Sequence, residues 1–346
     1  MENNIPKLTE ILDSQFNLKI SGNTEQFETN ILMELPANDW IELAKKLPNP
    51  KELFGTIWHQ GEVAILFSNT GKGKSILGVQ LANAIAKGEN ILEQKSFKQI
   101  SIYFDFELSS KAFQMRYTDN FDASYTFSQD FYRVEIDRDK ELETEEKSFE
   151  ELIIDSIKFQ VEKSKAQVVI IDNITFLSAS NEKSKEALAL MKLILNLSRK
   201  KNLAILLIAH TPKRDIYKPI QLEDLAGSKA LSNFCDVVFC IGESVKGSKI
   251  RYIKQLKNRN FPLEFHENNV IECEIVKENS FLQFKYLGTS TEDSHLRKIE
   301  SNNDSIEDIL ELKKQEFSNV EIGKRLGISE SAVRRRLKKY QNTDEK

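Results

Sequence analysis

The chain has 346 residues, with 49 lysines and arginines against 53 aspartates and glutamates, so its formal net charge is −4. That length allows one large α/β core and a small second module, and the charge gives no overall sign of nucleic-acid binding. The first 19 residues are polar, no apolar run approaches the roughly 20 residues of a membrane span, and the three cysteines lack metal-ligand spacing. We therefore expect a cytoplasmic protein with reduced cysteines and no membrane partner.

The first 50 residues are mostly polar and end in two prolines, Pro48 and Pro50. A short helix is predicted over residues 40–46, because the prolines that follow cannot continue it. We expect residues 1–50 to form an N-terminal arm, which either packs on a neighbouring subunit or acts as a lid.

A Gly-rich turn stands between an apolar run at 63–67 and an amphipathic helical pattern at 76–86. The order strand, turn, helix is typical of a P-loop, whose backbone N–H groups hold phosphate oxygens at the start of a helix. The predicted nucleotide-binding residues are Ser68, Asn69, Thr70, Gly71, Lys72, Gly73, Lys74 and Ser75. Lys74 would reach the terminal phosphates and the Ser75 hydroxyl would hold Mg²⁺, so the expected cofactors are ATP and Mg²⁺. Ser68 stands where the pattern usually opens with glycine, and the alternative is an ordinary surface loop.

Three further apolar runs, at 100–106, 168–172 and 203–208, predict strands of the same sheet. Asp172 ends the second run, where it suits the shell of a bound metal ion. The next residue, Asn173, cannot accept a proton, so we expect Glu107, just after the first run, to be the catalytic base. Parallel strands bring these ends to one edge of a sheet. The alternative for Glu107 is a solvated carboxylate at a strand end.

From about residue 53 to 288 the chain resembles the RecA/DnaB class of ATPases. The resemblance rests on an entry segment at 50–62 and on the run Phe104-Asp105-Phe106-Glu107-Leu108-Ser109-Ser110 followed by Met115-Arg116. In layout the chain is most similar to the compact plasmid helicases of the RepA type. The resemblance implies an α/β fold, with a RecA-like P-loop NTPase core and a mainly parallel sheet over residues 51–288.

The same resemblance implies roles for residues later in the chain. His210, at the end of the fourth strand, would sense the terminal phosphate, although a histidine packed at a strand end is the alternative. Lys257 and Arg259 would form a finger inserted into a neighbouring subunit, which implies a homo-oligomer, expected to be a hexamer. Two loops that face a central channel would contact single-stranded DNA through their basic residues, which are Lys183, Lys185, Lys213, Arg214 and Lys218. Ordinary solvated loops would explain these basic residues equally well.

Residues 289–304 are rich in serine, asparagine and glutamate and predict a linker. Helices are then predicted at 306–312, 319–326 and 330–340, with a turn at 327–329 and Ser329 capping the last helix. Residues 305–346 resemble a resolvase-type helix-turn-helix, a small all-α domain for duplex DNA. The expected DNA-binding residues of its third helix are Ser331, Arg334, Arg335, Lys338 and Lys339. The alternative is a basic surface helix in a protein-interaction module.

Together these features predict an ATP-hydrolysing ring protein that acts on DNA, with a helicase for replication of a plasmid or other mobile element as the most specific expectation. One alternative is an ATP-gated DNA-binding regulator, or an accessory protein of recombination or transposition, without helicase activity. A second alternative is a nucleotide-controlled scaffold.

Overall fold

The computed structural model describes residues 34–119, 122–137, 149–174, 183–211, 218–225, 228–296 and 306–344. The chain divides into two units, Met1–Pro50 and Lys51–Lys346. In the first unit, helix α2 (Ala37–Ala44) buries Leu43 against Leu35, Trp40 and Leu47. The helix predicted at 40–46 is present and begins three residues earlier, directly after Pro36.

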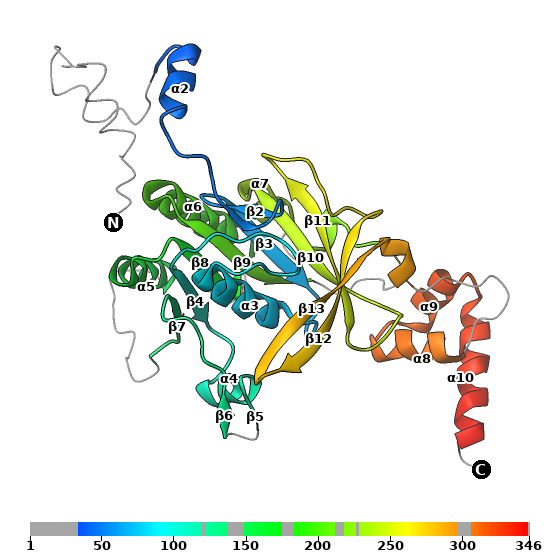
Figure 1. Cartoon of the computed structure of the whole chain (residues 1–346). Helices are drawn as coiled ribbons and strands as arrows, with labels where there is room; N and C mark the ends of the chain where they lie inside the picture. The colour runs from blue at the N-terminus through cyan, green and yellow to red at the C-terminus, as the bar shows by residue number, and fades with distance from the viewer. Residues whose placement is uncertain are drawn as a thin grey trace, which may run out of the picture. The chain divides into compact units, whose positions relative to one another are not determined.

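The second unit is built on a mixed sheet (Figure 1), which in the described part of the chain has nine strands in the order β13-β12-β11-β10-β3-β9-β8-β4-β7. The strands from β10 to β7 run parallel, and β10 to β13 form an antiparallel meander. Their bounds are β3 (Val63–Ser68), β4 (Ser101–Asp105), β7 (Phe131–Val134), β8 (Val168–Asp172), β9 (Ala204–His210), β10 (Val237–Glu243), β11 (Ile250–Asn258), β12 (Val270–Glu278) and β13 (Phe281–Ser290). The expected α/β class is confirmed, and the sheet is parallel over its larger part.

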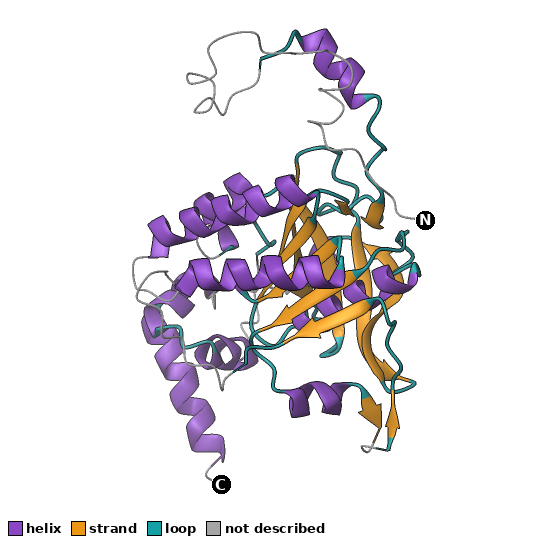
Figure 2. Ribbon diagram, turned by 90° about the vertical axis from the view of Figure 1, so that its left-hand side faces the viewer, coloured by secondary structure: helices purple, strands orange, loops and turns teal. Residues whose placement is uncertain are grey.

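Helices cover both faces of this sheet because its strands are apolar on both sides. On one face, helix α3 (Lys74–Lys87) packs against residues such as Leu66, Ile170 and Leu206. On the other face, α5 (Phe149–Ser164) and α6 (Lys183–Lys201) lie side by side, and α7 (Ser228–Phe234) packs beside α6 (Figure 2). Short elements connect these parts of the second unit: β1 (Glu52–Phe54), β2 (Trp58–His59), α4 (Ser110–Arg116), β5 (Thr118–Asp119), β6 (Ala123–Ser124) and η3 (Leu222–Asp224).

The segment after Gly288 belongs to the core, so the prediction that a linker begins at residue 289 is wrong. Strand β13 continues to Ser290, and the short helix η4 (Glu292–His295) buries both of its end residues. Glu292 and His295 are each 1% exposed, and Leu296 is also buried. The polar composition of this segment predicted that it would be exposed to solvent. Its polar side chains are instead buried and paired, because a charged group in a protein interior needs a partner. Residues 297–305 lie outside the described part.

Three helices at the C-terminal end have a hydrophobic cluster of their own. They are α8 (Ile306–Lys314), α9 (Asn319–Leu326) and α10 (Glu330–Asp344), and each contains the segment predicted for it. Ile309, Leu312, Phe317, Ile322, Leu326 and Val333 form the cluster. Gly327 has φ +67° in the turn, a conformation that favours glycine. Ser329 caps α10 as predicted, since its Oγ accepts the Ala332 N–H at 3.2 Å.

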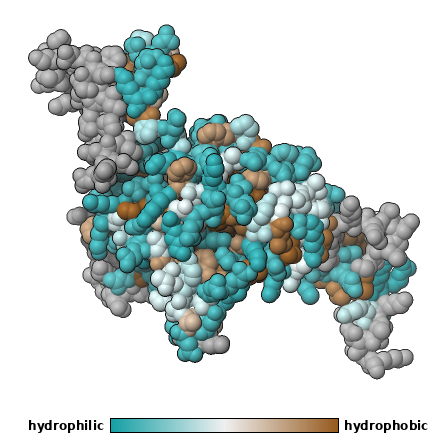
Figure 3. Space-filling view, in the orientation of Figure 1, coloured by the Kyte–Doolittle hydropathy of each residue, from teal (hydrophilic) through white to brown (hydrophobic). Residues whose placement is uncertain are grey.

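Among the described residues, no helix combines the length and the apolar composition that a membrane span requires. On the face drawn in Figure 3, apolar residues are interspersed with hydrophilic ones.

Candidate active site

The predicted P-loop forms the turn between β3 and α3. Gly71 and Gly73 have φ of +73° and +105°, which glycine adopts without steric cost. A Cβ on Gly73 would also lie 2.7 Å from the Phe284 ring of β13, so no other residue fits there. Ser68, by contrast, is the last residue of β3 and is not among the residues with positive φ. That explains why serine is tolerated where the motif usually has glycine.

The turn has the features of a polyphosphate cradle. Within the described residues, no group accepts a hydrogen bond from the backbone N–H groups of residues 69–73. These donors stand at the start of α3, where the helix dipole favours an anion. The Lys74 ammonium is almost buried and donates to the carbonyls of Ser68 and Asn69, each at 3.0 Å. Burial lowers the pKa of Lys74, and the Asp172 and Glu107 carboxylates oppose that shift.

Residues of β10 and β11 hold the outer side of the turn, and sequence reasoning missed them. The Glu243 carboxylate accepts from Asn69 Nδ2 at 3.2 Å and lies 2.8 Å from Lys72 Nζ. The Arg251 guanidinium is 8% exposed, and its Nε donates to the Lys72 carbonyl at 3.3 Å. Burial lowers the pKa of Arg251, with Glu243 opposing. Thr70, at the tip of the turn, is exposed.

Ser75 and Asp172 form the predicted metal pair. The Ser75 hydroxyl lies near enough to the Asp172 carboxylate to lower its pKa, and this carboxylate is 1% exposed at the end of β8. Tyr103 on β4 donates its hydroxyl to Asp172 Oδ2, at 2.5 Å. Burial raises the pKa of Asp172, and the hydroxyls of Ser75 and Tyr103 oppose that shift. Hydroxyl and carboxylate oxygens are ligands that Mg²⁺ prefers, so the donor set fits this ion.

Glu107, Asn173 and His210 meet at the carboxyl ends of β4, β8 and β9. Asn173 Nδ2 donates to Glu107 Oε1, and His210 Nε2 lies 3.2 Å from the same oxygen. The other ring nitrogen, His210 Nδ1, is buried and has no hydrogen-bond partner among the described residues. The side chain of Glu107 is 41% exposed, so it is accessible to water and substrate. The two predicted catalytic residues of this edge therefore lie together, as the sheet topology requires.

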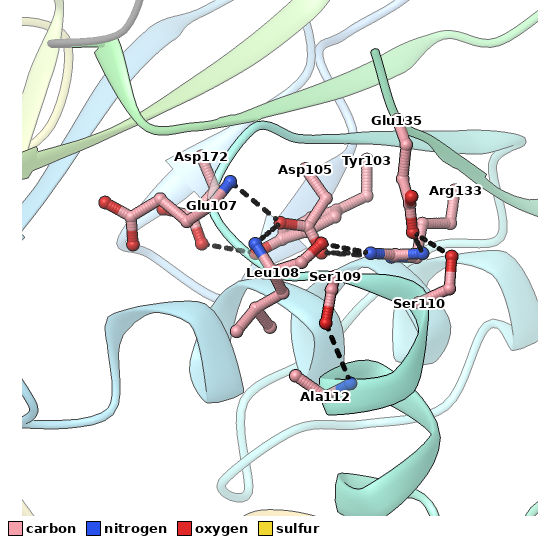
Figure 4. A network of polar contacts seen from close by, with 10 residues as sticks. All are labelled: Tyr103, Asp105, Glu107, Leu108, Ser109, Ser110, Ala112, Arg133, Glu135 and Asp172. Atoms are coloured by element: carbon pink, nitrogen blue, oxygen red, sulfur yellow. Dashed lines mark hydrogen bonds and ion pairs between the residues drawn. The ribbon is translucent and has the colours of Figure 1, made fainter. Parts of the chain in front are cut away.

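A second carboxylate lies beside Glu107, and its role escaped sequence reasoning (Figure 4). Asp105 ends β4 with its side chain fully buried. Its Oδ2 accepts from Arg133 Nη2 at 2.8 Å and Nε at 3.0 Å, and its Oδ1 accepts the Leu108 N–H at 2.8 Å. The only sequence signal was an aspartate at the end of an apolar strand, which needs a partner when buried.

Lys257 and Arg259 lie at the opposite end of the sheet from the P-loop. The Arg259 N–H donates to the Asp236 carbonyl, and Asp236 N–H donates to the Val63 carbonyl at the start of β3. The P-loop begins five residues further along β3, about 16 Å away at roughly 3.3 Å per residue. Lys257 Nζ is bound by the carbonyls of Ser232 and Cys235 at 2.6 and 2.9 Å, at the end of α7.

Arg259 is the more accessible of the two, with 47% of its side chain exposed, and it contacts Asp236 at 3.2 Å. Neither cation can reach the P-loop of its own chain. Their action on a neighbouring subunit stays a prediction.

The basic residues predicted for DNA are only partly described. On α10, Arg334, Arg335 and Lys338 are exposed, and Ser331 is exposed with its hydroxyl 2.9 Å from that of Ser329. The side chain of Lys339 lies outside the described part, as do Lys213 and Arg214. Lys218 is exposed, whereas the side chains of Lys183 and Lys185 are not described.

Comparison with known proteins agrees with this site. In a comparison with curated proteins, no sequence matches the chain. The model of a family described as AAA domain, AAA_25, matches residues 29–215, which is more than half of the chain. The match contains the P-loop, Glu107, Asp172 and His210, begins within the N-terminal arm, and ends before β10. Membership of this family implies that the site binds a nucleotide together with a divalent metal ion. The chain belongs to the AAA_25 family of P-loop ATPases, which are of the RecA/DnaB-like kind.

Proposed function

We propose that this protein hydrolyses ATP to act on DNA, and that its most specific function is that of a helicase for replication of a plasmid or other mobile element. One observation carries the catalytic part of the proposal. An accessible carboxylate, Glu107, stands next to the Ser75–Asp172 pair and beside the P-loop. This is the set of groups that nucleotide hydrolysis needs: a phosphate cradle, metal ligands and a base.

In this proposal each residue has one task. Lys74 turns from the carbonyls of Ser68 and Asn69 to the terminal phosphates, which are stronger acceptors because they are charged. Ser75 and Asp172 hold Mg²⁺, which neutralises phosphate charge when bound. Glu107 accepts the proton of the attacking water, and His210, whose Nε2 lies 3.2 Å from Glu107 Oε1, contacts the terminal phosphate.

We assign the last catalytic contribution to a second copy of the chain. Arg259 is exposed enough to leave Asp236 and lies too far from the P-loop of its own chain to act there. A guanidinium supplied by the neighbouring subunit would stabilise the charge that spreads over the phosphates during transfer. Lys257 would first have to leave two carbonyls, so Arg259 is the better candidate. This arrangement requires a homo-oligomer, and the hexamer is an analogy with the RecA/DnaB class.

DNA contact in this proposal has two parts. Helix α10 presents Arg334, Arg335 and Lys338 at its surface, as expected of a helix that lies in the major groove with its basic side chains on phosphates. The channel loops with Lys213 and Arg214 would follow a single strand. The separate hydrophobic cluster of α8 to α10 also favours the second candidate, an ATP-gated DNA-binding regulator, because a motor does not need a duplex reader.

The ATPase rate, measured with and without single-stranded DNA over a series of protein concentrations, tests the proposal. We expect the rate per subunit to rise with concentration and with added DNA, since the site is completed between subunits. Glu107→Gln is the matched variant. It keeps the shape of the side chain and should reduce turnover by roughly 10²-fold while nucleotide still binds. A rate that Glu107→Gln leaves unchanged would show that the base lies elsewhere.

Two further measurements separate the candidates. Strand displacement on forked DNA is expected of a helicase and not of a regulator. Deletion of residues 304–346 should leave the basal ATPase intact, because the α8 to α10 cluster contains no residue of the ATPase core, and should abolish site-specific duplex binding. If the tail binds no duplex at low salt, alone or as a tandem dimer, a protein-binding role for this unit replaces DNA binding.

A further inference from the structure

We propose that Asp105 and Arg133 are positioning residues, which act together to hold the carboxylate of Glu107 in its place for hydrolysis. This inference rests on the proposed role of Glu107 as the base. It concerns a buried ion pair in which one partner lies two residues from Glu107 and the other is on the edge strand β7.

The backbone around Glu107 lies outside regular structure. Strand β4 ends at Asp105 and helix α4 begins at Ser110, so residues 106–109 belong to neither. The Asp105 carboxylate supplies the hydrogen bonds that are missing there. Its Oδ1 accepts the N–H groups of Glu107 at 3.3 Å and Leu108 at 2.8 Å. Within the described residues, no other group is found to accept from either N–H.

Arg133 fixes the other oxygen of the same carboxylate. Its Nη2 and Nε donate to Asp105 Oδ2 at 2.8 and 3.0 Å, and Nη2 also donates to the Leu108 carbonyl at 3.0 Å. The guanidinium therefore contacts both ends of the turn that contains Glu107, at Asp105 and at Leu108. It also lies 4.4 Å from the centre of the Phe113 ring on α4 and contacts Glu135. Glu135 in turn accepts the Ser110 hydroxyl at 2.7 Å (Figure 4).

The side chain of Asp105 is 0% exposed and that of Arg133 is 16% exposed, so the pair is held in one geometry. An arginine presents a rigid planar fork, and lysine of the same charge cannot replace its several directed bonds. Loss of the fork should let the turn relax and move Glu107. A displacement of about 1 Å at a reacting group can cost on the order of 10²-fold in rate.

Arg133→Lys tests this directly, because it keeps the charge beside buried Asp105 and removes the fork. We expect kcat to fall by roughly 10-fold to 100-fold, while the affinity for a fluorescent ATP analogue with Mg²⁺ changes by less than about twofold. After gel filtration, the variant should retain unhydrolysed ATP longer than the wild type. Asp105→Asn is a second variant of matched size. It keeps an Oδ1 acceptor for the Leu108 N–H but turns an NH₂ group toward the Arg133 donors, so it too should lower kcat while ATP affinity is kept. Lys98→Met, which removes the exposed Lys98–Asp130 pair near the start of β7, is the control and should leave kcat unchanged.

The combination with Glu107→Gln separates positioning from a general structural role. If Arg133 acts through Glu107, Arg133→Lys should lower the residual rate of Glu107→Gln by no more than about twofold. The inference is overturned if Arg133→Lys lowers the rate of Glu107→Gln by the same factor as it lowers the wild-type rate. It is also overturned if Arg133→Lys loses ATP affinity in proportion to kcat. If Glu107→Gln is inactive while Arg133→Lys is fully active, the inference is overturned and the proposed role of Glu107 stands. A fully active Glu107→Gln would overturn the proposed base and the inference with it.

Discussion

The buried ion pair of Lys254 and Glu292 anchors the segment that follows β13, and its removal gives a sharp test of the fold. Lys254 Nζ lies 2.5 Å from Glu292 Oε2, and the two residues are 4% and 1% exposed. The other carboxylate oxygen, Oε1, accepts the Ile220 N–H at 2.8 Å and the Tyr252 hydroxyl at 2.9 Å. One carboxylate thus joins three segments that are distant in sequence.

Glu292→Gln keeps the size of the side chain but changes one oxygen into an NH₂ group. The Gln oxygen can still accept from Ile220 and Tyr252, whereas its NH₂ group would face the Lys254 ammonium, donor against donor. Among the described residues, Lys254 would retain only the Ile220 carbonyl, at 3.1 Å. A buried charge left without its partner costs about 3–5 kcal/mol. In a unit of this size that lowers the unfolding midpoint by about 6–20 °C.

Scanning calorimetry of three variants measures the effect. Glu292→Gln should unfold far below the wild type. The double variant Lys254→Met/Glu292→Gln should recover most of the loss, because no uncompensated charge remains. Glu278→Gln is the control, since it breaks the exposed pair with Lys285 and should change stability by no more than about 1 kcal/mol. A midpoint for Glu292→Gln within about 1 °C of the wild type, or no recovery in the double variant, would refute the reasoning.

Three other predictions address the catalytic edge, the subunit boundary and pH. Lys74→Ala should abolish hydrolysis and weaken binding of a fluorescent nucleotide, and a near-normal rate would contradict the P-loop assignment. Arg259→Ala should be nearly inactive yet bind ATP. Mixing it with Glu107→Gln should restore activity, because a mixed ring contains interfaces in which both groups are intact. If activity is not restored although subunit exchange is verified, action between subunits is excluded. Burial and the nearby Lys246 lower the pKa of His295, so the folded chain binds this proton more weakly than the unfolded chain. Its contribution to stability is complete above the unfolded pKa of about 6.5 and is lost as pH falls from there through the lower folded pKa, so His295→Gln should flatten the fall of the unfolding midpoint below about pH 6.5.

Much of the parallel core could be predicted, because each buried strand is a short, uninterrupted apolar run. Strands β3, β8 and β9 lie within two residues of their predicted bounds. The P-loop was recognisable from local order alone, since strand, turn and helix follow one another directly. Local sequence was also enough to predict the three C-terminal helices, with Ser329 as a cap and Gly327 in the turn.

The remaining elements depend on pairing across the chain. Strand β12 alternates apolar with charged residues, as in Glu272 and Glu274, and such a strand is defined only by its neighbours β11 and β13. Strand β7 has four residues and lies at the sheet edge, where few residues are needed to pair. The segment with Glu292 and His295 looked like a linker because burial of polar groups leaves no apolar pattern. Each of these errors arises where a partner distant in sequence decides the structure.

The candidate site divides in the same way. Lys74, Ser75 and Asp172 could be predicted because a strand or a helix fixes each of them, and local sequence shows where those elements begin and end. Glu107 stood in the same run as Asp105, and the sequence could not tell which acid faces solvent and which is buried. A buried aspartate requires a cation, but Arg133 lies 28 residues further along the chain, on a strand that local pattern does not predict. The residues assigned to the nucleotide and the metal ion are thus the ones that sequence can find. The residues that hold them in position become visible only when the strands are placed side by side.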